Sequence, residues 1–93
     1  MEIVAKPTIN NTDLTLANTE YSYSLPDGTK SFSIRLRNVG YPLQLAMISG
    51  ESNTTYVNIP QGGNFLEEDI KSNITLYFRT TSGGQVAEIL TWK

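Results

Sequence analysis

Apolar and polar residues alternate with a period of two along most of the chain. In the clearest run, Phe32, Ile34 and Leu36 are separated by Ser33 and Arg35. This spacing is typical of a β-strand that buries one face and leaves the other in water. The pattern predicts a chain built from strands. The same alternation, or a shorter β-prone run, recurs in six further segments: 14–17, 21–25, 43–48, 54–59, 74–79 and 86–92.

Residues that favour turns separate these runs. Pro26–Thr29 combines a proline, which fixes φ, with a glycine, which accepts a positive φ. Gly50–Asn53 and Pro60–Gly63 carry further strand breakers, and Ser82–Gly84 predicts a hairpin between the last two strands. Short strands at this spacing are typical of sandwiches and small barrels. We therefore expect an all-β fold: a single antiparallel β-sandwich, jelly-roll-like, with seven or eight strands.

Helical periodicity is almost absent from the sequence. The one segment that suits a helical turn is Asn64–Ile70, where Glu67, Glu68 and Asp69 would lie at the start of the turn. Acidic residues are favourable there because they interact with the unpaired N–H groups of a helix N-terminus. We expect no more than one turn of helix, and we expect it in this segment.

The first twelve residues differ in pattern from the rest of the chain. Pro7 denies a sheet one N–H donor, and Asn10–Thr12 favours a turn. Residues 1–12 are therefore predicted to form either an N-terminal arm that adds a strand to a neighbour or an edge strand of the protein's own sheet. Residues 13–93 are predicted to form the β-sandwich domain.

Several strands carry apolar residues on both faces, which a monomeric sandwich does not require. Another chain would cover such outward positions, and barrel-like curvature or a long loop would cover them equally well. We take the first alternative as the hypothesis for a subunit or capsid interface. Its candidate residues are Ile3, Val4, Ile9, Ile48, Leu90 and Trp92.

The composition argues against catalysis. The chain contains neither Cys nor His, which removes a thiolate metal site, the commonest general base and the commonest transition-metal ligand. Ser and Thr are plentiful, but as nucleophiles they would lack a His base. Its only carboxylate cluster, Glu67–Asp69, lacks the alternating Asp/Asn and Gly pattern of a calcium loop, and neighbouring strand residues point to opposite faces. We therefore expect no enzyme activity, no catalytic residues, no cofactor and no metal site.

Charge and hydropathy argue against two further classes of partner. Seven basic residues are outnumbered by nine acidic ones, whereas nucleic-acid binding depends on a basic surface. Pro42 and Gln44 interrupt the longest uncharged apolar stretch, Tyr41–Gly50, which is too short to span a membrane. The N-terminus also lacks the apolar run of a signal peptide. We expect neither a nucleic-acid partner nor a membrane partner, and we expect synthesis in a cytoplasm.

The aromatic residues offer one alternative function. Tyr21 and Tyr23 share a strand face, as successive sugar-stacking rings require. The further candidates are Tyr41, Tyr56, Tyr77 and Trp92. Packing in the core or at an interface explains Tyr and Trp equally well. A small carbohydrate-binding β-sandwich module is therefore kept as an alternative.

The chain as a whole resembles a group of small virion proteins of tailed bacteriophages, encoded among head and structural genes. The resemblance covers residues 12–93 and lies in strand patterns and turns rather than in a chemical motif. The segments that carry it are Leu14–Ser22, Lys30–Arg37, Ser49–Pro60, Ile74–Arg79 and Val86–Trp92.

This resemblance implies a β-sandwich that decorates or cements the capsid exterior and is made in the cytoplasm of a bacterial host. The implied partners are the major capsid protein or other virion proteins, and the implied assembly is a homo-oligomer, with a trimer favoured. Another virion position, in a head-to-tail, tail or fibre component, is the nearest alternative.

Overall fold

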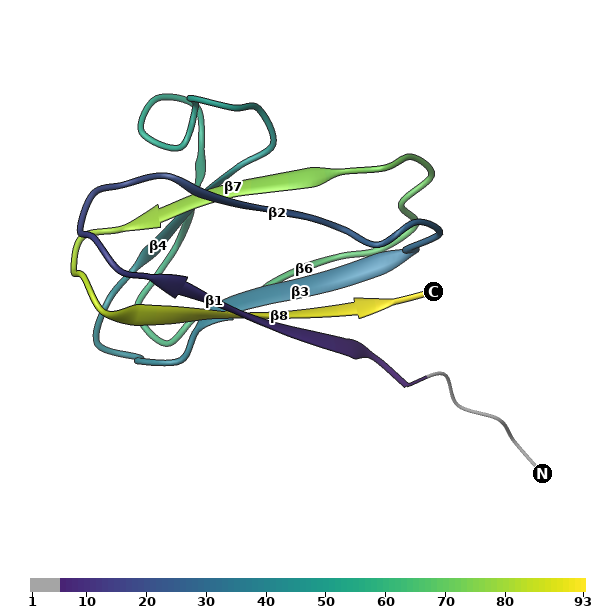
Figure 1. The fold of residues 1–93 in the computed structure, drawn as a ribbon, viewed down its shortest axis with the longest axis horizontal. Helices are drawn as coiled ribbons and strands as arrows, with labels where there is room; N and C mark the ends of the chain where they lie inside the picture. The colour runs from purple at the N-terminus through teal and green to yellow at the C-terminus, as the bar shows by residue number, and fades with distance from the viewer. Residues whose placement is uncertain (1–5) are drawn as a thin grey trace.

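The computed structural model describes residues 6–93, which form eight strands arranged in two sheets (Figure 1). All strand pairs are antiparallel. The all-β sandwich predicted from the sequence is confirmed. In chain order the strands are β1 (Thr8–Leu14), β2 (Tyr21–Ser24), β3 (Ser31–Leu36), β4 (Leu43–Ala46), β5 (Val57–Ile59), β6 (Phe65–Glu67), β7 (Thr75–Thr80) and β8 (Gln85–Trp92).

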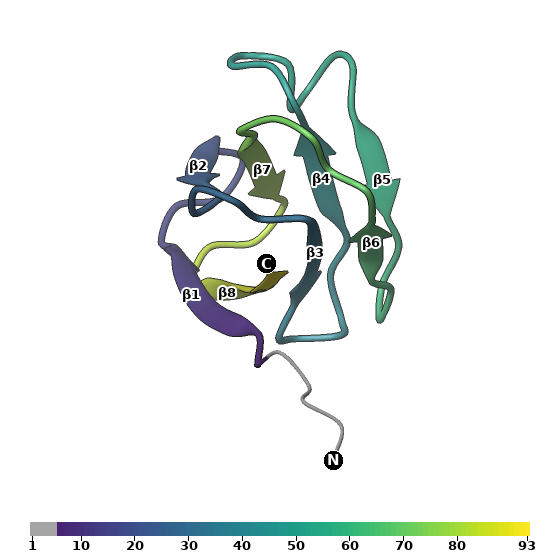
Figure 2. The same ribbon diagram turned by 90° about the vertical axis from the view of Figure 1, so that its right-hand side faces the viewer.

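The two sheets have the strand order of a jelly roll. The first sheet is ordered β1-β8-β3-β6 and the second β2-β7-β4-β5. Figure 2 shows the two layers, with β1 and β8 below β2 and β7. Every connection between successive strands crosses from one sheet to the other, except the connection between β4 and β5. The β4–β5 loop, residues 47–56, is therefore the one link that stays within its own sheet.

The core lies between the sheets and is built from the inward residues of the alternating runs. Strand β3 buries Phe32, Ile34 and Leu36 and turns its other residues outward, as its sequence predicts. Phe32 also stacks obliquely on Phe65 of β6, with ring centroids 5.9 Å apart. The period of two thus places the apolar side chains of both sheets in one cluster. Its buried members are Leu14, Leu25, Phe32, Ile34, Leu36, Leu43, Leu45, Ile59, Leu76, Phe78, Ala87 and Ile89.

The hairpin predicted at Ser82–Gly84 is wrong. Strands β7 and β8 lie in different sheets, so residues 81–84 cross from one sheet to the other. Glycine is needed at position 83 because the backbone passes close to the residue after β1. A Cβ at this position would lie 2.8 Å from the Thr15 carbonyl oxygen. Gly84 has a φ of 73°, and its N–H donates to the carbonyls of Leu14 and Thr15. The glycines anchor this connection against the end of β1.

The helical turn predicted at Asn64–Ile70 is also wrong, because Phe65–Glu67 form edge strand β6 beside β3. Of the strand predicted at 14–17, only Leu14 lies in a strand. The observed strand, β1, begins at Thr8 and ends at Leu14. The turn predicted at Asn10–Thr12 is wrong as well, because these residues lie within β1. Of the two alternatives for residues 1–12, residues 8–12 form the edge strand, which pairs with β8.

Candidate functional site

The six predicted interface residues do not form one surface. Ile3 and Val4 lie outside the described residues. Ile9, Leu90 and Trp92 lie on the outer face of the first sheet, where Ile9 is directly opposite Leu90. Ile48 lies in the β4–β5 loop, which belongs to the second sheet. The structure therefore divides these candidates between two surfaces on opposite sides of the sandwich.

The first surface is formed by four exposed apolar side chains at the β4–β5 loop. Met47, Ile48, Tyr56 and Val57 are 40–64% exposed, and we call this group the loop surface. They line a groove of about 270 Å³ together with Leu45, Ala46 and Thr55. Figure 1 shows the loop projecting above the second sheet, on the side away from β1 and β8.

Ile48 is the only member of this group that the sequence pattern identified as an interface residue. The alternation placed Met47 and Val57 with the inward residues, but β4 ends at Ala46 and β5 is a three-residue edge strand. Ala46 points outward on β4 and is nevertheless 3% exposed. Thr55 and Tyr56 line the same groove as Ala46, so the returning loop shelters this position.

The loop is held by a carboxylate from the segment before β2. Glu20 accepts hydrogen bonds from the N–H groups of Gly50 at 2.9 Å and Ser52 at 3.2 Å. The hydrogen bond from the Ser52 side chain, followed by that from the Gly50 N–H, lowers the pKa of the Glu20 carboxyl below its ordinary value. Within the loop, the Thr54 and Thr55 N–H groups both donate to the Glu51 carbonyl, and Ser52 is buried. The apolar side chains are thus presented on an ordered support.

The second surface is a trough on the outer face of the first sheet. Its floor is Ser31 and Ser33 of β3, whose side chains point outward because Phe32 and Ile34 point into the core. Trp92 lies opposite Ser31, and Leu90 lies opposite Ser33, on neighbouring strand β8. On the other side, Leu66 of β6 lies opposite Ser33.

Small residues on the central strand and larger residues on its two neighbours account for this hollow. The hollow lined by Ser31, Leu66, Glu68 and Trp92 has a volume of about 400 Å³. The sequence predicts a helical turn at Asn64–Ile70, so it does not identify Leu66 and Glu68 as site residues. The adjacent β-prone pair Phe65 and Leu66 was the available signal for a strand.

A charged group borders the same face. Glu88 of β8 accepts hydrogen bonds from Arg35 Nε at 3.0 Å and Arg37 Nε at 2.9 Å. These bonds, that from Arg37 first, lower the pKa of the Glu88 carboxyl. Arg35 and Arg37 thus form an ion-pair network with Glu88 on this face.

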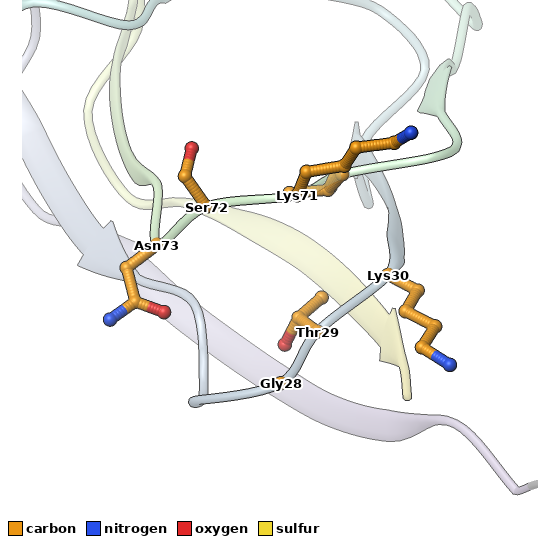
Figure 3. A pocket seen from close by; sticks show the side chains of 7 residues that line it. Gly28, Thr29, Lys30, Lys71, Ser72 and Asn73 are labelled. Atoms are coloured by element: carbon orange, nitrogen blue, oxygen red, sulfur yellow. The ribbon is translucent and has the colours of Figure 1, made fainter.

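A polar hollow of about 190 Å³ lies between the β2–β3 turn and the β6–β7 loop, and its lining includes Lys30, Lys71, Ser72 and Asn73. Figure 3 shows the ammonium groups of Lys30 and Lys71 pointing in different directions. The Thr29 hydroxyl is already used, since it donates to the Pro26 carbonyl at 2.6 Å. The side chains do not converge on one ligand position, so this hollow supports no binding hypothesis.

Tyr21 and Tyr23, the pair considered as an alternative sugar-stacking platform, do not form an outward surface. The two rings do share a strand face, but that face is turned inward, and both pack against the core cluster. The Tyr21 hydroxyl also accepts a hydrogen bond from the Leu16 N–H at 3.0 Å. Two of the other aromatic candidates line outward hollows: Tyr56 lies in the groove of the loop surface, and Trp92 lies in the trough.

Among residues 6–93, no three Asp or Glu side chains gather as a metal-binding group. That part of the chain also contains no helix able to cross a membrane. The candidate sites are therefore the loop surface and the trough.

No family model, no curated protein and no solved structure matches the chain.

Proposed function

We propose that this protein is a non-enzymatic structural subunit of a bacteriophage virion, of the type that decorates or cements the capsid exterior. The resemblance of residues 12–93 to small phage virion proteins supports this role. The jelly-roll body supports it as well, because a shell-binding subunit needs a rigid scaffold rather than a catalytic cleft.

The loop surface is the observation that carries the proposal. Met47, Ile48, Tyr56 and Val57 remain substantially exposed around one groove. Exposed apolar groups of this kind mark a site of contact with another protein. Covering the exposed half of each side chain contributes about 1 kcal/mol per residue. Because Glu20 and the internal turns hold the loop, little conformational entropy is lost on docking.

The partner in this proposal is the major capsid protein, and the assembly is a homotrimer formed after synthesis in the bacterial cytoplasm. The trimer follows from the resemblance, since decoration proteins commonly sit where three capsid subunits meet. A head-to-tail, tail or fibre position would use the same loop surface on a different virion protein, so the location of the protein in the particle distinguishes these alternatives.

The test is whether the purified protein binds again to particles of the phage whose genome carries its gene. Particles from a strain with the gene deleted are mixed with purified protein, sedimented through a density gradient and assayed for bound protein. We expect saturable binding that Ile48→Asp weakens at least tenfold. Val39→Asp is the matched control, since Val39 is 67% exposed and Ile48 is 64% exposed, but Val39 lies in the β3–β4 loop outside the loop surface.

The structural role is refuted if the protein is absent from purified wild-type particles. The contact assignment is refuted separately if Ile48→Asp and Val39→Asp bind with the same affinity as the unsubstituted protein. Cryo-electron microscopy of decorated particles then locates the density on the shell, as expected for a decoration protein, or on the tail.

A further inference from the structure

We propose that the trough between Trp92 and Leu66 binds a neutral sugar. This surface lies on the first sheet, whereas the loop surface lies on the second, so the inference is independent of attachment to a particle. It assigns Trp92 to a ligand rather than to the subunit contact expected from the sequence.

The walls of the trough have the chemistry of a sugar-stacking site. Trp92 offers an indole ring, and Leu66 is 53% exposed on the opposite side. The faces of a pyranose ring carry C–H groups, which pack favourably on the electron-rich face of an aromatic ring. Strands β8 and β6 flank β3, so the walls stand two strand spacings apart, about 10 Å.

The floor and rim supply polar partners for the sugar hydroxyls. Ser31 lines the hollow, and the Ser33 hydroxyl donates to Asn64 Oδ1 at 2.9 Å, which leaves the Ser33 oxygen free to accept. Glu68 adds a carboxylate, which accepts strong hydrogen bonds from hydroxyl groups. Donors and acceptors beside an aromatic wall match a ligand that is polar at its edge and apolar on its faces.

Charge restricts the class of sugar. Glu68 lines the trough beyond the end of β6, so this side of its rim carries a negative charge. A carboxylated or sulfated sugar would be repelled there. The backbone beneath the trough is a paired ladder of β8, β3 and β6, so the site is formed before the ligand arrives.

The direct assay is the fluorescence of Trp92, which is the only tryptophan in the chain. The intact protein is titrated with neutral oligosaccharides of glucose, mannose and N-acetylglucosamine, and with sialyllactose and oligogalacturonate as anionic probes. We expect a saturable change in emission with at least one neutral probe and none with the anionic probes. In amide NMR spectra of the unsubstituted protein, the same probe shifts residues 31, 66, 68 and 92.

Filling the floor separates sugar binding from a nonspecific change in fluorescence. Ser31→Val occupies the trough with a residue that favours strands, and we expect it to weaken binding at least tenfold. Ser22→Val is the matched control, since Ser22 is an outward serine of β2 in the other sheet. Glu68→Gln should weaken binding severalfold by removing the charged acceptor.

The proposal is overturned if no neutral probe gives a saturable signal by fluorescence or NMR, or if the shifted amides lie away from the trough. It is also overturned if folded Ser31→Val binds as tightly as Ser22→Val. None of these outcomes would contradict the proposed attachment to particles, because the test of attachment depends on Ile48.

Discussion

Replacing Glu20 by glutamine tests whether this carboxylate organises the β4–β5 loop. In the folded protein its two oxygens accept the Gly50 and Ser52 N–H groups at 2.9 and 3.2 Å. Glutamine has nearly the same shape, but it offers one acceptor oxygen and places an NH₂ group where the second acceptor was. The change therefore leaves one backbone N–H facing another donor and removes the charge from the remaining hydrogen bond.

The magnitude follows from the number of bonds and their exposure. Removing a partner from a charged hydrogen bond costs about 1.5–3 kcal/mol when the site is buried. Glu20 is only partly buried, so water replaces much of the lost interaction, and a cost of about 1 kcal/mol is expected. For a domain of this size that corresponds to a fall in Tm of about 4–8 °C.

The pH dependence has a definite sign. The pKa of Glu20 is lowered in the folded state, so its stabilising contribution is present above the pKa of the unfolded chain and is lost as the pH falls through the folded pKa. The difference in stability between the unsubstituted protein and Glu20→Gln should therefore be largest near neutral pH and shrink in acid.

Calorimetry across pH measures this difference, and amide hydrogen exchange localises it. Exchange at Gly50 and Ser52 should accelerate in Glu20→Gln, whereas amides of the core strand β3 should change only with global stability. Glu67→Gln, at an exposed carboxylate of β6, is the control. The reasoning is refuted if Tm and the exchange of both loop amides are unchanged, or if the difference grows as the pH is lowered.

Three further predictions follow from the packing and charge. Phe78→Ala removes a fully buried ring and should lower the free energy of unfolding by about 3–5 kcal/mol in a urea titration; a loss below 1 kcal/mol would contradict the assigned core. Glu88→Gln weakens an exposed ion pair network and should cost less than about 1 kcal/mol, with a smaller effect at high salt; a larger, salt-independent loss would contradict this. Sedimentation at micromolar concentration should show a trimer, and a clean monomer would remove the support for the proposed assembly.

The sequence was most informative where a strand lies in the middle of a sheet. Strands β3, β4, β7 and β8 each have neighbours on both sides, and alternation alone identifies β3 and β7, which bury one face. Strands β4 and β8 carry apolar residues on both faces and were recognised as β-prone runs between turn residues. Edge strands β5 and β6 have three residues each, which is too short for a period of two to stand out. Leu66 and Val57 were misjudged for this reason, and the misjudged residues lie at the candidate sites.

Long-range pairing was the second source of error. A glycine pair between two strand-like runs locally resembles a hairpin, and nothing within Ser82–Gly84 distinguishes a hairpin from a crossing between sheets. The distinction depends on a contact with a segment far away in the sequence. The Thr15 carbonyl oxygen would lie 2.8 Å from a Cβ added at Gly83. Tyr21 and Tyr23 illustrate the same limit, since alternation shows that they share a face but not that the face is turned inward.

The jelly roll separates residues that maintain the fold from residues available for binding. Its crossing connections tie the sheets together, and the core depends on the inward residues of central strands such as β3 and β7. The β4–β5 loop leads only to a three-residue edge strand, so its exposed side chains can change with little effect on that core. The trough uses outward positions of strands whose inward positions carry the core, so Ser31 can be substituted without disturbing Phe32. Binding and stability should therefore respond to different substitutions on the same strand.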